Sequence, residues 1–159
     1  MIKQCTNTED IISLWSEIFG DTREEIKFFI NNIQHAICLG YYRDNELASM
    51  LFLVDCNIKM YSAKYIYAAS TKKCYEGLGY MTELIKYCQK DECLICLIPA
   101  NDDLINFYKA RGFISKTGIE HISFDENERI TEYLLEGYHL TEPQVMIYER
   151  SKDGLRFFS

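Results

Sequence analysis

The sequence predicts a mixed α/β fold in which helices flank one central sheet. Segments with apolar residues at helical spacing alternate with runs rich in β-branched and aromatic residues, which are typical of strands. The expected order is one strand, two helices, three strands, a helix, a strand, a helix and then further strands. The 159 residues have the usual size of one compact domain, so we expect a single domain over residues 1–159.

The first part of the chain predicts a short strand followed by two helices. Residues 1–5 are expected to form the strand, and Thr8 is expected to cap a first helix that Gly20 ends. Thr22 and Glu25 have the spacing of a capping box, in which each side chain accepts a hydrogen bond from the other residue's backbone N–H. This box is expected to open the second helix.

The middle of the chain predicts strands around a loop and a helix. A turn signal at residues 44–45 separates strands that are expected over residues 35–42 and 46–55. Another strand is expected over residues 58–71, and a glycine-containing loop and a helix follow it. Residues 92–98 form a continuous apolar run, as in a strand that is buried on both faces of a sheet.

The last part of the chain begins with a predicted helix. Asn101 is expected to cap this helix, because Asp102 and Asp103 follow in the first turn, where the helix dipole favours acidic side chains. Gly112 is expected to stop it. The remaining expected elements are one or two strands within residues 113–124, a helix over residues 130–135 and a strand over residues 144–149.

Composition narrows the class of partner. The formal net charge of −7 disfavours nucleic acid, which needs clustered cationic side chains, and favours a neutral or cationic small molecule. No apolar run approaches the roughly 20 residues that span a membrane. The seven cysteines are an odd number and the first residues do not have the pattern of a secretory leader, so we expect no leader, reduced thiols and a cytoplasmic protein without a membrane partner.

Gly77 and Gly79 lie between a predicted strand and a predicted helix. Glycines at this position let backbone N–H groups approach an anion, and the helix N-terminus adds unsatisfied donors and partial positive charge. A phosphate or pyrophosphate is the natural occupant, although an ordinary turn has the same pattern. The loop lacks the Walker sequence, and Thr82 stands where a dinucleotide fingerprint requires its third glycine.

A second motif follows about twenty residues later. The buried strand ends before Asn101, and the helix after it contains the Phe107-Tyr108 pair and ends in Gly112-Phe113. Over roughly residues 47–113 the chain therefore resembles the GCN5-related N-acetyltransferase (GNAT) superfamily, which combines these two motifs in this order. Residues 65–71 and the Phe19-Gly20-Asp21 segment look most like the branch that includes the enhanced-intracellular-survival type acetyltransferases.

The resemblance implies a GNAT fold with a central mixed, mostly antiparallel sheet, and it implies acetyl-CoA as cosubstrate. Backbone groups of Ala69, Ser70 and Thr71 would pair with the pantetheine arm, as an added strand would. Asn101 would contact the cosubstrate where two central strands splay. The N–H groups expected to wrap the pyrophosphate belong to Glu76, Gly77, Leu78, Gly79, Tyr80, Met81 and Thr82.

The resemblance also implies that Tyr108 is the general acid. Attack of an amine on a thioester expels a thiolate, and a nearby phenol can supply the proton. The alternative is that Tyr108 only packs beside Phe107. Two positions depart from the family pattern, because Glu76 stands where Arg or Gln is usual and Met81 replaces the usual small residue. A carboxylate beside a pyrophosphate is repulsive unless it points to solvent.

Other candidate sites are weaker. Cys93 and Cys96 have the spacing of a metal or redox pair, but residues three apart in a strand point to opposite faces, so we expect core cysteines and no metal. Glu120 and His121 lie late in the chain, where an acceptor could bind, and are alternatives for a base. The remaining candidates are His35 and His139, which lack a partner at a useful spacing, and the strand residues Tyr41, Tyr42, Tyr61, Tyr65 and Tyr67.

Two hypotheses follow. The first is an N-acetyltransferase that moves an acetyl group from acetyl-CoA to a primary amine by direct attack, and the acidic net charge favours a cationic acceptor. The second is a non-catalytic module of the same fold that binds acyl-CoA or a protein partner, which Glu76 favours. The general base and the oligomeric state stay open, with a homodimer as one option.

Overall fold

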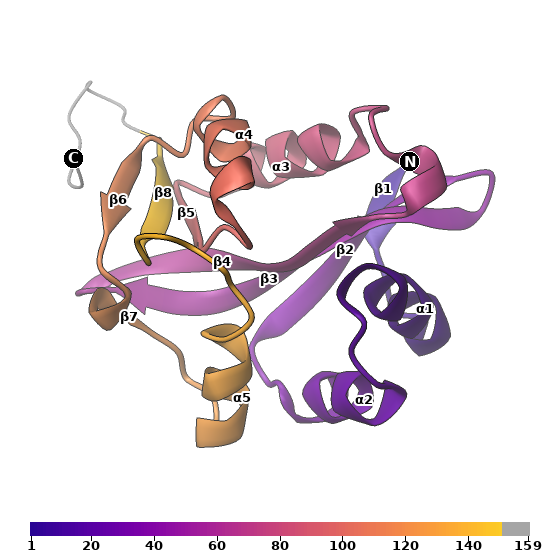
Figure 1. Ribbon diagram of the computed structural model, residues 1–159, viewed down its shortest axis with the longest axis horizontal. Coiled ribbons are helices and arrows are strands. Elements are labelled where there is room, and N and C mark those ends of the chain that lie inside the picture. The colour runs from indigo at the N-terminus through magenta and orange to yellow at the C-terminus, as the bar shows by residue number, and fades with distance from the viewer. Residues whose placement is uncertain (151–159) are drawn as a thin grey trace.

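The computed structural model describes residues 1–150, whose strands form one sheet with helices on both faces (Figure 1). The strand order is β1-β2-β3-β4-β5-β8-β6, and β7 pairs with β3. Every pairing is antiparallel except that of β4 with β5, so the sheet is mixed and mostly antiparallel, as predicted. The strands are β1 (Ile2–Gln4), β2 (Ala36–Arg43), β3 (Glu46–Ile58), β4 (Tyr61–Thr71), β5 (Leu94–Leu97), β6 (Ser115–Thr117), β7 (Ile122–Ser123) and β8 (Val145–Glu149).

The helices divide between the two faces of the sheet. Helices α3 and α4 cover one face, whereas α1, α2 and α5 cover the other (Figure 1). Across residues 1–150, no helix combines the length and apolar character that crossing a membrane requires. The helices are α1 (Thr8–Phe19), α2 (Arg23–Asn32), α3 (Tyr80–Asp91), α4 (Ile105–Lys109) and α5 (Glu128–Leu134).

The caps of α1 and α2 agree only in part with the sequence. The capping box of α2 is confirmed, because the Thr22 N–H donates to Glu25 Oε1 at 2.9 Å and the Glu25 N–H donates to Thr22 Oγ1 at 3.2 Å. The expected cap at Thr8 is wrong, since Thr8 is already helical. Asn7 has the extended backbone that a cap needs, and its Oδ1 accepts from the Asp10 N–H at 3.1 Å.

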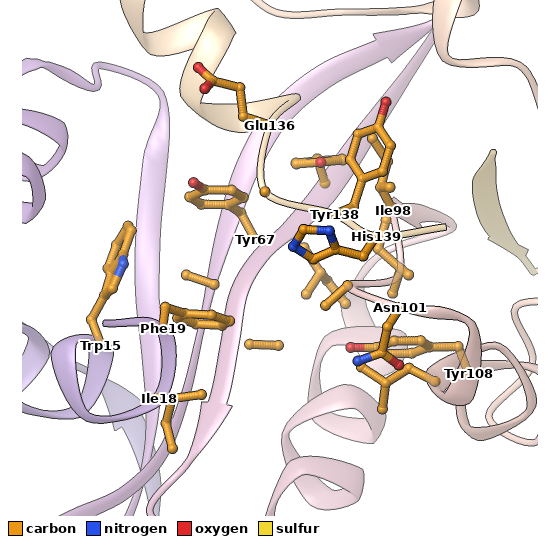
Figure 2. A pocket seen from close by; sticks show the side chains of 18 of the residues that line it. Trp15, Ile18, Phe19, Tyr67, Ile98, Asn101, Tyr108, Glu136, Tyr138 and His139 are labelled. Carbon is orange, nitrogen blue, oxygen red and sulfur yellow. The ribbon is translucent and has the colours of Figure 1, made fainter. Parts of the chain in front are cut away.

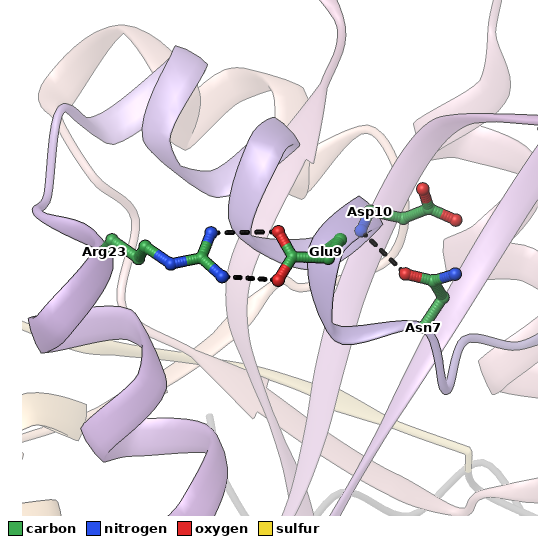
Figure 3. A network of polar contacts seen from close by, with 4 residues as sticks. All are labelled: Asn7, Glu9, Asp10 and Arg23. Atoms are coloured by element: carbon green, nitrogen blue, oxygen red, sulfur yellow. Dashed lines mark hydrogen bonds and ion pairs between the residues drawn. The ribbon is translucent and has the colours of Figure 1, made fainter.

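An ion pair joins the starts of α1 and α2 (Figure 3). The Arg23 guanidinium donates to both carboxylate oxygens of Glu9, at 2.9 and 2.5 Å. This contact lowers the pKa of Glu9, chiefly through the hydrogen bond from Arg23. Both side chains are about half exposed or more, so the pair contributes little to the stability of the fold.

Each face of the sheet has its own core. On the α1–α2–α5 face, Phe29 is fully buried and packs against Trp15, Phe52 and Tyr67, with ring centroids 5.2 to 5.4 Å away. On the α3–α4 face the buried side chains include Leu84, Ile85, Ile95, Leu97, Tyr108 and Phe113. Strand β5 supplies both cores, which confirms the prediction of a strand buried on both faces.

Several boundaries differ from those expected. Strand β4 begins at Tyr61 rather than at residue 58, because Lys59 adopts a positive φ of 55° in the turn after β3. The predicted strand region 113–124 contains only β6 and β7, with a 3-10 turn at Ile119–His121 between them. The predicted single domain also includes residues 151–159, which lie outside the described part of the chain.

Candidate functional site

A cleft of about 600 Å³ opens where β4 and β5 diverge (Figure 2). The two strands are paired only at Lys64 with Ile95 and at Tyr65 with Cys96. Beyond these pairs β4 continues for six residues, Ile66–Thr71, which have no register partner on the β5 side in the described part of the chain, residues 1–150. Its free edge and the end of β5 therefore form the two sides of the cleft.

A β-bulge bends β4 along this edge. Phe52 pairs with Tyr67 and Met50 pairs with Ser70, so Leu51 alone faces the two residues between them on β4. Ala68, the first of these, has a left-handed φ of 53°, which an L-residue with a side chain rarely adopts. The bulge turns the strand at the point where Ala68 and Ala69 line the cleft.

The three residues that resemblance assigns to the pantetheine arm are placed unequally. Ala69 lines the cleft, whereas Ser70 and Thr71 continue β4 beyond it toward the glycine loop. The side chains of both are held within the sheet, because Thr71 Oγ1 lies 2.8 Å from Ser49 Oγ and Ser70 Oγ donates to the Ala68 carbonyl at 3.2 Å. Only their backbone groups remain for a ligand at this edge.

The glycine loop leads directly into α3, as expected. Gly77 and Gly79 have φ values of 80° and 83°, and a Cβ at either would meet nothing within 4 Å. Backbone conformation rather than crowding therefore requires glycine here. The first helical hydrogen bond runs from the Glu83 N–H to the Gly79 carbonyl at 3.0 Å, which leaves the amides of Tyr80, Met81 and Thr82 outside the helical ladder.

Glu76 differs from the other residues of the loop. Its N–H already donates to the Lys73 carbonyl at 3.3 Å, so this amide is less available to an anion than the amides that follow. Its side chain is exposed to solvent. Lys72 does not face Glu76 but pairs with Glu46, with Nζ 2.5 Å from Oε1.

The start of α3 is tied to the end of α4 through Arg111. Its Nε donates to Thr82 Oγ1 at 2.9 Å, and its Nη1 donates to the Phe107 carbonyl at 2.7 Å. The guanidinium also lies 3.6 Å from the centroid of the Phe107 ring. These contacts fix the helix that carries Tyr108 against the loop that carries the free amides.

Tyr108 combines a buried ring with a hydroxyl at the cleft surface. The ring packs edge-on against Phe107 and Phe113, and the residue is only 7% exposed. Burial raises the pKa of Tyr108 to about 12, against a small opposing effect of Arg111. Every buried side-chain oxygen within residues 1–150 has a hydrogen-bond partner, whereas the Tyr108 hydroxyl has none there. This oxygen is therefore not buried, and it opens into the cleft that Tyr108 lines.

Asn101 lies in the cleft but does not cap a helix through its side chain. The expected cap is wrong because a 3-10 turn at Asp102–Leu104 precedes α4, which begins only at Ile105. Asn101 instead has extended backbone and forms a parallel bridge with His139. The Asp102 carboxylate accepts from the Thr141 N–H at 3.1 Å and from its hydroxyl at 2.5 Å.

The residues of the opposite wall of the cleft were not recognised as one site in the sequence, although Phe19, Asp21 and His139 were named there on separate grounds. This wall includes Trp15, Phe19 and Asp21 from the end of α1 and the turn after it, and Glu136 and His139 from the segment after α5 (Figure 2). The Trp15 Nε1–H donates to Asp21 Oδ2 at 2.8 Å, which holds this carboxylate at the aromatic wall. No short motif marks these residues, because they meet only in the folded chain.

Two tyrosines of β4 hold the end of α5 at this wall. The Tyr65 hydroxyl donates to the Leu134 carbonyl at 2.6 Å, and the Tyr67 hydroxyl donates to the Tyr133 carbonyl at 2.9 Å. Burial raises the pKa of Tyr67, and the nearby charges of Asp21 and Glu136 raise it further. Both carboxylates line the cleft, so its wall beside Tyr67 carries acidic side chains.

The other sequence candidates lie elsewhere. His121 Nδ1 lies 2.8 Å from Thr117 Oγ1, and neither His121 nor Glu120 lines the cleft. Cys96 is buried as expected, but Cys93 is exposed and its Sγ accepts from Arg150 Nη2 at 3.1 Å, so its assignment to the core is wrong. Within the described residues, no three His, Cys, Asp or Glu side chains gather to hold a metal ion. Tyr65 and Tyr67 line the cleft, whereas Tyr41, Tyr42 and Tyr61 do not.

Replacement of Gly79 tests the loop. We expect Gly79→Ala to weaken coenzyme A binding about tenfold, because a side chain at φ 83° costs about 1–2 kcal/mol and relaxation would turn the free amides away. Gly79→Asn is the matched control, since Asn tolerates this conformation better, and it should lose less. Calorimetric titration with coenzyme A measures both, and unchanged affinity in Gly79→Ala would exclude the loop from binding.

The comparisons with known proteins agree with this geometry. The family model of the acetyltransferase (GNAT) domain matches residues 4–114, which is more than half of the chain. An acyl-CoA N-acyltransferase from Pseudomonas aeruginosa is similar in structure, with a TM-score of 0.58 and 18% identity over 93% of this chain and 97% of its own. Tetrahymena GCN5 has a TM-score of 0.58 and 11% identity over 95% of this chain and 96% of its own.

One of the similar structures is a longer protein, and this chain matches only part of its length. A conserved protein from Enterococcus faecalis V583 has a TM-score of 0.58 and 18% identity over 70% of this chain, and the match covers 31% of that protein. No curated protein sequence matches the chain significantly. At these identities the structural matches establish the fold, which is that of the acyl-CoA N-acyltransferases. Together with the match over residues 4–114, the fold shows that the chain belongs to the GNAT acetyltransferase family.

Proposed function

We propose that the protein is an N-acetyltransferase that transfers the acetyl group of acetyl-CoA to a primary amine by direct attack in a ternary complex. The observation that carries this proposal is the Tyr108 hydroxyl, which has no hydrogen-bond partner among residues 1–150 and opens into the cleft beside the edge of β4. The amide-bearing start of α3 continues from the same edge of the sheet.

The chain offers what acetyl-CoA would need. The stretch Ile66–Thr71 pairs with β3 on one side, and its other edge would present backbone groups to the amides of a pantetheine arm, as a neighbouring strand would. The amides of Tyr80, Met81 and Thr82, at the positive end of a 12-residue helix, suit a pyrophosphate. Leu78, Gly77 and Gly79 complete the loop, and Asn101 faces the cleft at the point where the strands separate. Bound acetyl-CoA supplies the activated carbonyl and a thiol leaving group.

Tyr108 is the proposed general acid. Its high pKa keeps the phenol protonated at neutral pH, so it can donate a proton to a thiolate as the carbon–sulfur bond breaks. The ring contacts with Phe107 and Phe113 fix the direction of the hydroxyl.

The proposed acceptor is a cationic primary amine. Asp21 and Glu136 place two carboxylates at the wall of the cleft, and Trp15, Phe19 and Tyr67 provide aromatic rings beside them. Carboxylates attract an ammonium group, and aromatic faces stabilise it through cation–π contact. This composition supports an amine over a neutral or anionic acceptor.

The test of this function is direct. The protein is mixed with acetyl-CoA and a panel of diamines, aminosugars and lysine peptides, and free thiol is measured together with the acetylated product. Saturable thiol release with matching product supports the proposal. Tight binding of acetyl-CoA without transfer to any amine in the panel favours the alternative, a non-catalytic acyl-CoA-binding module.

Glu76 is the feature that favours this alternative, and its replacement gives a prediction. We expect Glu76→Gln to strengthen coenzyme A binding about two- to fivefold, because an exposed carboxylate is removed from the positive end of α3. Isothermal titration at low ionic strength measures the change. Glu24→Gln on α2 removes an exposed carboxylate far from the loop and serves as control. Equal affinity in all three proteins would show that Glu76 does not affect the ligand.

The following predictions stay proposals. We propose one domain over residues 1–159, a cytoplasmic location consistent with seven cysteines that are free in the described chain, and a likeness to the enhanced-intracellular-survival branch. The last rests on residues 65–71, which form the bulged edge of the cleft, and on Phe19 and Asp21, which lie at the acceptor wall. A homodimer is testable by light scattering.

A further inference from the structure

The proposed reaction requires a base, and this inference rests on that proposed function. An alkyl amine with a pKa of about 10 is mostly protonated at neutral pH, and an ammonium nitrogen has no lone pair for attack. The carboxylate-rich wall beside Tyr67 would stabilise the ammonium form further. A group in the cleft must therefore accept a proton before transfer.

The three histidines differ in their surroundings. His35 Nε2 lies 3.3 Å from the Asp125 carboxylate, and His121 Nδ1 lies 2.8 Å from the Thr117 hydroxyl. The ring of His139 has no hydrogen-bond or ion-pair partner within residues 1–150, and it lines the cleft. Figure 2 shows this imidazole projecting into the cavity. A free imidazole can accept a proton without first breaking a contact.

The backbone holds His139 in place. Its N–H donates to the Ala100 carbonyl at 2.7 Å, and the residue forms a bridge with Asn101 at the end of β5. Two residues later, Thr141 is bound to the Asp102 carboxylate through both its N–H and its hydroxyl. The segment is thus anchored to the chain just before α4, the helix that carries Tyr108. Hydrogen bonds therefore connect the segment that carries His139 to the segment that leads into the helix of Tyr108.

The other titratable groups of the cleft are less suited to the role. Burial raises the pKa values of Tyr65, Tyr67 and Tyr108, so these phenols stay protonated and cannot accept a proton at neutral pH. Asp21 already accepts the Trp15 N–H. The remaining titratable side chains that face the cleft are Glu136 and Tyr138. Of all these groups, imidazole is the side chain whose ordinary titration range spans neutral pH.

We propose that His139 is the catalytic base that deprotonates the acceptor ammonium. The imidazole takes one proton and becomes imidazolium, and the amine nitrogen then forms its bond to the acetyl carbonyl carbon. The carbon–sulfur bond breaks, its electron pair goes to sulfur, and Tyr108 protonates that sulfur. The second nitrogen proton leaves to solvent, from which the Tyr108 phenolate regains one, and His139 releases its proton to solvent.

The kinetic test compares His139→Gln with His121→Gln, a variant of a histidine outside the cleft. We expect His139→Gln to lower kcat/KM for an alkyl amine by about 10²–10⁴-fold and to abolish the fall in rate on the acidic side of the pH profile. With trifluoroethylamine, which is largely neutral at pH 7, the deficit should be much smaller. His121→Gln should match the unmodified protein. An equal loss of kcat/KM with both amines would overturn the assignment, and so would a pH profile that is unaltered in His139→Gln. It would also be overturned if Glu136→Gln, rather than His139→Gln, showed these changes.

A second measurement does not depend on turnover. With only three histidines in the chain, the imidazole ¹³C–¹H signals can be assigned from the two single variants. In the presence of coenzyme A, added amine should shift the His139 signal and change its titration midpoint, while the His35 and His121 signals stay in place. No shift at amine concentrations that saturate binding would refute the proposal. Failure of the proposed function looks different, since the unmodified protein would then transfer acetyl groups to no amine.

Discussion

Tyr108→Phe is expected to lower kcat by about 10²–10⁴-fold while coenzyme A affinity changes less than twofold. The variant keeps the ring contacts with Phe107 and Phe113, and loss of the hydroxyl leaves no hydrogen-bond partner unsatisfied among residues 1–150. Only the proton donor to the leaving thiolate is removed. Steady-state kinetics with a saturating amine, together with calorimetry for coenzyme A, separate the chemical step from binding.

The pH dependence of kcat in the unmodified protein is an independent test of Tyr108 as the general acid. Because burial raises the pKa of Tyr108 to about 12, the acid stays protonated through the alkaline range, and kcat should not fall up to about pH 10.

The matched control for Tyr108→Phe is Tyr87→Phe. Tyr87 is an exposed tyrosine on α3, so this variant should retain full activity. A Tyr108→Phe variant with full kcat would remove Tyr108 from the reaction and leave it a packing residue.

Phe29→Ala is expected to lower the free energy of unfolding by about 3–5 kcal/mol. Phe29 is fully buried and contacts the rings of Trp15, Phe52 and Tyr67, so truncation leaves a cavity bounded by aromatic side chains. Urea titration measures the loss. Two of these neighbours line the cleft, and we therefore also expect the KM for the amine to rise more than the KM for acetyl-CoA.

The adjacent residue provides the control for this substitution. Phe28 lies on the same helix but is 38% exposed, so Phe28→Ala should cost well under 2 kcal/mol. If Phe29→Ala does not fold, Phe29→Leu retains part of the volume and should show a smaller loss in the same direction. A cost for Phe29→Ala no larger than that of Phe28→Ala would mean that this face of the sheet is not tightly packed.

Features carried by short stretches of sequence could be predicted. The order of the elements, the capping box at Thr22, the buried strand β5 and the glycine loop each depend on residues only a few positions apart. Local hydrogen bonding and hydrophobic spacing determine such features, and residue type reports on both. Tyr108 could be placed at a site for the same reason, since its motif lies within one helix and the strand before it.

Features that depend on distant segments could not be predicted. The Ala68 bulge arises from register with β3, and nothing in the Ala68-Ala69 pair distinguishes it from ordinary strand. Asp21, Glu136 and His139 line one cleft because β4 tyrosines bind the end of α5 and because His139 bridges to Asn101. The prediction that Asn101 caps a helix was wrong because a 3-10 turn stands where the first helical turn was expected, and Asp102 of this turn binds the distant Thr141.

The short parallel contact between β4 and β5 has a mechanical consequence. Within residues 1–150, only the two register pairs between β4 and β5 join the strands β1 to β4 to the strands β5, β8 and β6. A ligand lying along this edge of β4 would bridge the two parts of the sheet. Because it would bind only the folded chain, its binding would raise the free energy of unfolding. The protein with bound cosubstrate would then be more rigid than the free protein. The cosubstrate would serve both as a reactant and as an additional strand beside β4.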